Sequence, residues 1–264
     1  MDFSEPLLLN GLASILWPLC RVSGFLMTMF IISGSTVPTV VRALFCLALT
    51  VCVLPGIPEL PESPQLFSGE GILTTIMQVL IGAALGFMTI YLSQAFIIAG
   101  QAVAMQTGLG FASLVDPVSG TNTPVVGQFF TVLCTLVFFA VDGHLIFIRL
   151  MLLSFSLVPI GPQFLSEEGL TYLIFFGATM FQTALAMSMS AICTMLVVNF
   201  TFGVMTRAAP QLNVFSMGFA VSMVVGLFVL WYSLNAFMGN FTQLANTLMA
   251  ETCSLMGGSC EGVF

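Results

Sequence analysis

Charged residues are scarce in this chain: only 6% of its 264 residues are Asp, Glu, Lys or Arg, whereas 58% are hydrophobic. About a quarter of the residues of an ordinary globular domain are charged, so the composition excludes a water-soluble fold. Lysine is absent, and four arginines stand against eleven acidic residues. Nucleic-acid surfaces and polybasic lipid anchors need clustered positive charge, and the chain has none to supply.

Residues that build catalytic or metal sites are equally sparse. His144 is the single histidine, and the seven cysteines form no C-x-x-C pair of the kind that marks zinc or redox sites. A phosphate-binding loop needs a lysine, and no G-x-S-x-G elbow accompanies His144. We therefore predict no catalysis, no metal and no cofactor. Two tail cysteines, Cys253 and Cys260, can pair only in an oxidising compartment.

Long uncharged runs fill most of the chain. A helix needs about 20 apolar residues to cross the hydrocarbon core of a bilayer. The sequence predicts six such helices, at residues 7–32, 37–54, 72–98, 125–141, 170–198 and 217–239. A seventh apolar stretch, 145–160, is short and contains Arg149, so we expect it to be interfacial, re-entrant or packed on the other helices. The predicted fold class is an all-α polytopic membrane protein of helical hairpins, forming one membrane-embedded domain over residues 1–264.

The short loops indicate an orientation. The start of the chain carries Asp2 and Glu5 where a secretory signal carries positive residues, so it is interpreted as the beginning of the first span. Cytoplasmic loops favour arginine, which places Arg42 and Arg207 inside, and both termini outside. Arg149 then falls outside, against this rule. Prolines at every third position of residues 55–64 predict a stiff connection.

Small residues recur at four-residue spacing in the predicted spans. The positions are Gly82, Gly86, Gly218, Ser222 and Gly226. Small side chains let helix backbones approach closely in lipid. The pattern predicts helix packing, either within the chain or between subunits.

Two polar features lie in or beside spans. Arg21, inside the first span, is interpreted either as a charge that lines a conduit or pairs with an acid of another subunit, or as a residue snorkelling to the interface. Asp142 and His144 are either a proton site or part of a helix-ending turn. We favour the turn, with Gly143 as the C-terminal cap.

Residues 105–124 combine helix breakers with apolar side chains. Gly108, Gly110 and Pro117 disfavour a helix, whereas Phe111 and Leu114 are too apolar for an ordinary solvated loop. Irregular backbone at membrane depth must be buried in protein or line a cavity. The segment is therefore interpreted as a plug or gate, or as a loop folded back onto its own bundle.

The segment VVNFTFGVMTRAAPQLNVFSMGF, residues 197–219, holds Arg207 in a polar break between apolar runs. Together with GAALG from Gly82, GQAVAMQTGLGFASLVDP up to Pro117, and Gly143-His144, it resembles the FliR family of flagellar and type III secretion export-gate proteins. The family pattern is carried by Asn199, Gly203, Arg207, Pro210, Gln211, Asn213 and Phe215. The resemblance covers essentially the whole chain. Two positions differ from the common pattern: Gln78 replaces an acid, and Ala220 replaces a proline.

The resemblance implies a subunit of the export apparatus in the bacterial inner membrane and the flagellar basal body. Its partners would be FliP-like and FliQ-like proteins in a closed helical gate, other export proteins and unfolded protein substrates. It further implies a plug loop at residues 105–122, in which we single out the following residues: Met105, Gly108, Gly110, Phe111, Leu114, Asp116 and Pro117. It also implies a polar helix break at 199–216 in which Arg207 pairs within the gate. Independently of the resemblance, the Gly-rich end of the chain predicts a flexible tail at 250–264. By resemblance, the sequence of residues 206–215 favours a flagellar over an injectisome role.

Two other functions remain open. A self-contained secondary transporter would use Arg21, Asp116, Asp142 and His144 as a coupling set, although no repeat relates the two halves of the sequence. An intramembrane hydrolase would require His144.

Overall fold

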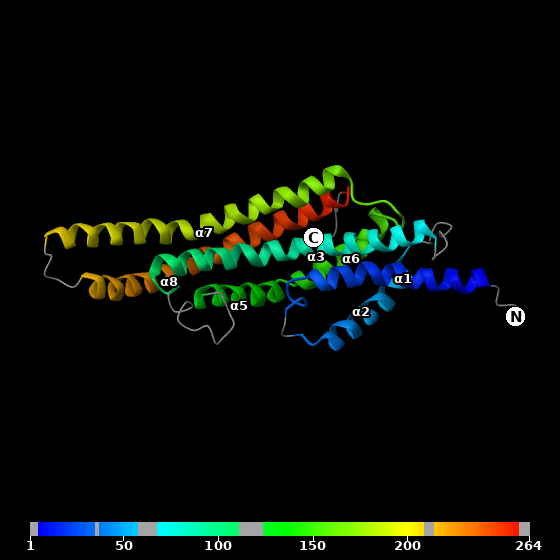
Figure 1. The fold of residues 1–264 in the computed structure, drawn as a ribbon, viewed down its shortest axis with the longest axis horizontal. Coiled ribbons are helices and arrows are strands. Elements are labelled where there is room, and N and C mark those ends of the chain that lie inside the picture. Colours follow the sequence, from blue (N-terminus) through cyan, green and yellow to red (C-terminus); the bar gives the residue numbers. More distant parts are fainter. Residues whose placement is uncertain (1–4, 35–36, 58–67, 111–123, 209–213, 259–264) are drawn as a thin grey trace. The chain divides into compact units, whose positions relative to one another are not determined.

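The computed structural model describes residues 5–34, 37–57, 68–110, 124–208 and 214–258, with only the backbone described at 5–10 and 214–217. All of its regular elements within these ranges are helices (Figure 1). They are α1 (Glu5–Thr28), α2 (Thr39–Val53), the short helix η1 (Leu54–Gly56), α3 (Gly69–Thr107), α5 (Val125–Ala140), α6 (Gly143–Leu157), α7 (Glu167–Ala208) and α8 (Val214–Leu255). The predicted all-α membrane fold is confirmed.

Five of these helices are long and apolar enough to cross a membrane, and α5 with α6 adds a sixth if the bent pair counts as one span. The stretch predicted to be re-entrant or packed is thus α6, which follows α5 after a sharp bend at residues 141–142.

Three helices are longer than the sequence predicts. The helix α3 continues to Thr107, α7 to Ala208 and α8 to Leu255. At 1.5 Å per residue, helices of 39 and 42 residues measure about 58 and 63 Å, roughly twice the hydrocarbon thickness. Backbone hydrogen bonding continues until a residue leaves the helical region, as Gly108 does after α3 with φ 78° and Gly257 does after α8 with φ 71°.

The predicted irregular segments are correspondingly shorter. Residues 105–107 belong to α3, 199–208 to α7 and 250–255 to α8, so the plug-like loop, the polar break and the tail all begin later than expected. The cysteine pair proposed for the tail includes Cys260, which lies outside the described residues.

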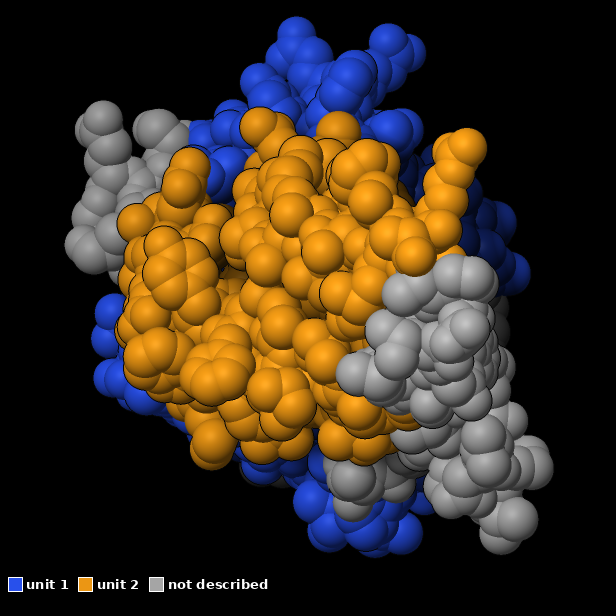
Figure 2. All heavy atoms as spheres, turned by 90° about the vertical axis from the view of Figure 1, so that its left-hand side faces the viewer, with its two compact units in different colours: residues 1–91, 138–176, 247–264 blue, residues 92–137, 177–246 orange. Residues whose placement is uncertain are grey.

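The chain forms two compact units, coloured blue and orange in Figure 2. The first comprises residues 1–91, 138–176 and 247–264, and the second comprises 92–137 and 177–246. Helices α3, α5, α7 and α8 contribute residues to both.

In the first unit, α1 and α3 approach closely through glycines. A Cβ atom on Gly82 would collide with the backbone carbonyl of Arg21, and one on Gly86 would collide with Thr28 and the carbonyl of Phe25. Gly24 of α1 meets the carbonyl of Val79 in the same way. The backbones of the two helices can therefore meet only where these positions carry no side chain.

The turn between α5 and α6 differs from its predicted form. The left-handed residue is Asp142, with φ 55°, and not Gly143, which begins α6. Aspartate tolerates this conformation better than most residues because its short side chain can hydrogen-bond locally. Gly143 is small for another reason: an added Cβ would lie 2.7 Å from the ring of Phe138. The predicted turn exists, but the assignment of Gly143 as its cap was wrong.

In the second unit, aromatic rings form the centre of the packing. Phe96 of α3 lies 4.6 Å from Phe237 and 5.8 Å from Phe241 of α8, measured between ring centroids. Phe130 of α5 lies 5.8 Å from Phe237. All four rings are at most 2% exposed, so they join α3, α5 and α8 into one core.

Candidate functional site

Arg21 lies at the centre of a buried polar cluster in the first unit. Its guanidinium is 0% exposed and is surrounded by α1, α3 and α6. Nε donates to Oε1 of Gln78 at 2.7 Å, one NH group donates to the carbonyl of Ser154 at 2.8 Å and to its hydroxyl at 3.3 Å, and the other donates to the carbonyl of Val158 at 2.9 Å. The guanidinium carbon lies 4.4 Å from the ring centroid of Phe155.

The hydrogen-bond and ring partners of Arg21 among the described residues are all neutral groups of its own chain. These bonds within the chain were not expected from the sequence, whereas a place beside a conduit, an acid of another subunit and the membrane interface stay predictions. Its planar, forked donors match acceptors that α3, α6 and the start of the α6–α7 connection present from different directions. Arg21 ties these helices together.

The same cluster holds the start of the connection between α6 and α7. Arg21 bonds the carbonyl of Val158, and Nε2 of Gln78 lies 3.4 Å from the carbonyl of Gly161. The sequence analysis did not find Gln78, Ser154 or Val158 as partners. The sequence held one signal that could have pointed to these partners: Gln78 is an amide at a position where the family pattern commonly has an acid.

The described part of the predicted plug segment is the end of α3. Met105 is 62% exposed, Gly108 has φ 78°, and the amide of Gly110 donates to the carbonyl of Ala104 at 2.9 Å. This bond folds the chain back over the last turn of the helix. The remaining predicted plug residues, Phe111, Leu114, Asp116 and Pro117, lie outside the described residues.

The end of α3 is held against α8 within the second unit. A Cβ on Gly226 would lie 2.5 Å from the Cβ of Thr107, and a Cβ on Gly108 would lie 3.2 Å from the ring of Phe219. The point where the chain leaves α3 is thus positioned by a close helix crossing at Gly226.

Three residues of the predicted polar motif lie on one face of α7. Asn199, Gly203 and Arg207 follow one another at four-residue spacing and are all exposed. Within the described ranges, the side chains of Asn199 and Arg207 have no hydrogen-bond or ion-pair partner. Pro210, Gln211 and Asn213 lie outside those ranges. Phe215 falls in the first turn of α8, where only the backbone is described.

Gly218, a predicted packing position, shows no close helix approach. A Cβ on Gly218 would lie 3.7 Å from the ring of Phe202, which is ordinary contact. The half-buried Ser222 donates its hydroxyl to the carbonyl of Gly218, one turn earlier, at 2.6 Å.

Among the described residues of the coupling set predicted for a transporter, no hydrogen bond or ion pair joins one member to another. Arg21 bonds neither Asp142 nor His144, and Asp116 lies outside the described residues. Asp142 is exposed, whereas the His144 ring lies 5.0 Å from that of Phe139 and its buried Nδ1 has no partner in the described part of the chain. Within that part, no group of three or more His, Cys, Asp or Glu side chains could hold a metal ion.

Comparison with known proteins shows the family of this chain. The sequence profile of the bacterial export proteins, family 1, matches residues 12–248. The chain belongs to this family. It is a multi-pass membrane protein of bacterial protein export and flagellar biosynthesis, and the resemblance to the FliR family is confirmed.

Several curated relatives of this export family carry the same name, flagellar biosynthetic protein FliR. The one from Escherichia coli K12 is 32% identical over 256 residues, covering 97% of this chain and 90% of the relative. The one from Pectobacterium carotovorum is 31% identical, with 87% of both chains covered. The one from Bacillus subtilis is 28% identical and covers 80% of this chain and 82% of the relative.

Proposed function

We propose that this chain is a non-enzymatic core subunit of the flagellar type III export gate in the bacterial inner membrane, forming part of the conduit through which unfolded flagellar subunits pass. The observation that carries the proposal is the similarity to proteins named FliR along nearly the whole chain, up to 97% of it. Eight of the matching relatives bear this flagellar name, which favours a flagellar over an injectisome role.

The exposed face of α7 supports assembly with other membrane proteins. Arg207 and Asn199 are exposed on a helix whose neighbouring side chains are apolar, such as Phe200 and Val204 at 72% and 55% exposed. A charge facing hydrocarbon without a partner costs several kcal/mol by most estimates. A protein surface that supplies an acid or carbonyl groups would remove this cost, and we assign that role to FliP-like and FliQ-like subunits.

The end of α3 supports the gating part of the proposal. The irregular part of the predicted plug segment begins at Gly108, next to the crossing of Thr107 with Gly226. A loop that leaves a rigid helix end can close a conduit while its anchor stays in place. We propose that Phe111 and Leu114 close the path, and that both termini lie in the periplasm.

The assembly is tested by replacing Arg207 with glutamate in cells that lack the native chain. We expect Arg207→Glu to be inserted and folded normally, because Arg207 has no partner in the described residues, but to lose copurification with the other gate subunits and to abolish motility. Arg149→Glu, at another exposed arginine, is the matched control and should retain both. A motile Arg207→Glu strain with an intact complex would refute the assembly role.

The plug is tested separately by permeability. Gly108→Asp and Phe111→Asp should admit small molecules or ions across the inner membrane while the gate subunits still copurify. If neither variant changes permeability or flagellar secretion, the plug assignment is wrong even if the assembly role stands.

A further inference from the structure

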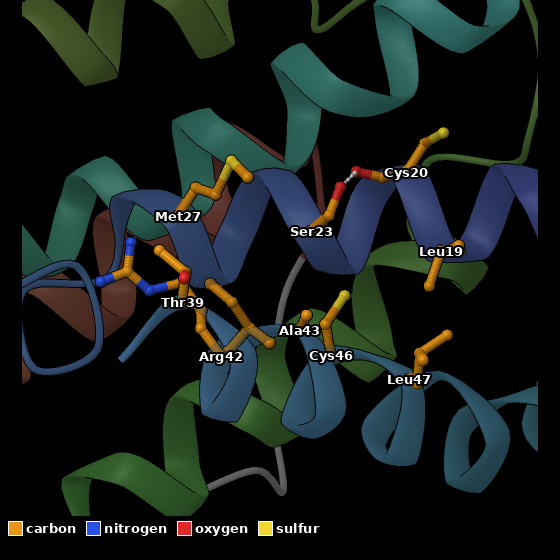
Figure 3. Close-up of a pocket in the computed structure, with 10 residues that line it drawn as sticks. Leu19, Cys20, Ser23, Met27, Thr39, Arg42, Ala43, Cys46 and Leu47 are labelled. Atoms are coloured by element: carbon orange, nitrogen blue, oxygen red, sulfur yellow. Dashed lines mark hydrogen bonds between the residues drawn. The ribbon is translucent and has the colours of Figure 1, made fainter. Parts of the chain in front are cut away.

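A cavity of about 420 Å³ lies between α1 and α2 in the first unit (Figure 3). Leu19 and Leu26 of α1 and Ala43 and Leu47 of α2 are among the side chains that line it. Most of α2 is exposed, since only 17% of its apolar span is buried. The cavity is thus an apolar space within a segment that can cross a membrane.

The one charged side chain of the lining lies at one end of this cavity. Figure 3 shows Thr39 and Arg42 together at that end, with Leu19 and Leu47 at the other. The hydroxyl of Ser23, partway along the wall, donates to the carbonyl of Cys20 at 2.9 Å and needs no other partner. The lining contains no acidic residue.

The polar end carries a positive charge with unused donors. One NH group of Arg42 donates to the carbonyl of Gly34 at 3.1 Å, whereas its Nε is buried and has no partner among the described residues. A buried donor without a partner costs about 1–3 kcal/mol. The first turn of α2 follows Pro38, which provides no side-chain cap for the amide groups at this helix end. Such an end favours an anionic oxygen ligand.

The dimensions fit a lipid better than a partner helix. Leu47 follows Thr39 by eight residues, which corresponds to about 12 Å along α2. One leaflet contributes about half of the 30 Å hydrocarbon core, so the cavity spans most of one acyl chain below its headgroup. A helix 10–12 Å wide fills roughly 420–610 Å³ with each turn, so this cavity would hold only about one turn.

We propose that this cavity binds one anionic phospholipid, with an acyl chain along the apolar wall and its phosphate at Arg42 and the first turn of α2. The phosphate supplies the acceptors that Arg42 lacks, and the acyl chain fills the space between the helices. The lipid therefore completes the contact between α1 and α2.

The experiment measures lipid retention by the full-length protein, solubilised with phosphatidylcholine vesicles containing phosphatidylglycerol and analysed by native mass spectrometry. We expect one phosphatidylglycerol to be retained in preference to phosphatidylcholine. Because a basic residue near a headgroup changes lipid affinity by about fivefold, Arg42→Gln should weaken retention by this factor. Arg42→Lys should keep most of it, and Arg149→Gln, which removes an arginine outside the cavity, should keep all of it.

A second variant tests the apolar wall. Ala43→Phe fills the cavity and should expel the lipid of either headgroup, with the helix content checked by circular dichroism. Equal retention of the two lipids by the wild type, or unchanged retention in Arg42→Gln, would overturn the proposal. It would also be overturned if Ala43→Phe kept its lipid but released another membrane protein, since a partner helix would then be the occupant.

Discussion

Replacing Arg21 with methionine tests whether the buried polar cluster holds the first unit together. Methionine has a similar length and is apolar, so the change removes the charge and all four hydrogen bonds without opening a large void. The carbonyl of Ser154 keeps the amide of Val158 as a donor at 2.9 Å. Oε1 of Gln78 and the carbonyl of Val158 lose the partners recorded for them.

The expected loss follows from these two acceptors. An unsatisfied buried acceptor costs about 1–3 kcal/mol, and a desolvated cation–π contact is worth about 2 kcal/mol. Removing the guanidinium also removes its own desolvation cost, which is several kcal/mol and acts in the opposite direction. We therefore expect a net loss of about 2–4 kcal/mol. This corresponds to a fall in melting temperature of roughly 4–16 °C for a chain of this size.

The measurement is thermal unfolding of the purified protein in mild detergent, with Arg149→Met as the control at an exposed site on α6. The double variant Arg21→Met, Gln78→Leu sharpens the test, because replacing both partners with apolar groups leaves fewer unsatisfied atoms. It should be no less stable than Arg21→Met alone. If Arg21→Met melts with the wild type, or if the two losses simply add, the cluster does not stabilise the unit as described.

Four further substitutions probe the same unit by melting temperature, and Gly239→Ala in the second unit is a control. Gln78→Glu places a carboxylate 2.7 Å from the buried guanidinium and should stabilise the protein near neutral pH; a fall in melting temperature would contradict this. Gly82→Ala should destabilise by several degrees because the helices must separate, whereas Gly239→Ala, with nothing within 4 Å of an added Cβ, should be neutral or gain up to about 1 kcal/mol. Equal effects at the two glycines would rule out the close crossing. Asp142→Gly should raise the melting temperature slightly, because glycine adopts the left-handed conformation without strain. Gly143→Ala should lower it, because the added Cβ would collide with the ring of Phe138. A lower melting temperature for Asp142→Gly than for Gly143→Ala would refute this account of the turn.

The fold class follows from the sequence because uncharged runs of this length have few alternatives to membrane helices. The helix ends do not follow as well. Hydropathy falls where polar residues begin, as at Asn199. The helix nevertheless continues to Ala208, because no proline interrupts its backbone hydrogen bonds before that residue. At Gly108 the breaker was recognised correctly, although the irregular segment was expected to start three residues earlier.

The candidate site shows the same division. The motif around Arg207 is continuous in the sequence and could be recognised from it. The partners of Arg21 are 57 residues away at Gln78 and 133 residues away at Ser154, and no local pattern connects them. At the α5–α6 turn the sequence predicted the turn but the wrong left-handed residue, because the constraint on Gly143 comes from the packing of Phe138.

The distance between Arg21 and its partners has a consequence for the biogenesis of the protein. Ser154 is synthesised 133 residues after Arg21, which takes about 7–27 s at ordinary rates of bacterial translation. Throughout that interval α1 carries an arginine that disfavours its release into lipid by about 2.5–3.5 kcal/mol. The first helix should therefore stay beside the insertion machinery until α6 has emerged, so that the two enter the membrane together. In a ribosome-stalled chain that ends before Ser154, α1 should still be extractable from the membrane. In one that extends beyond Val158, it should not.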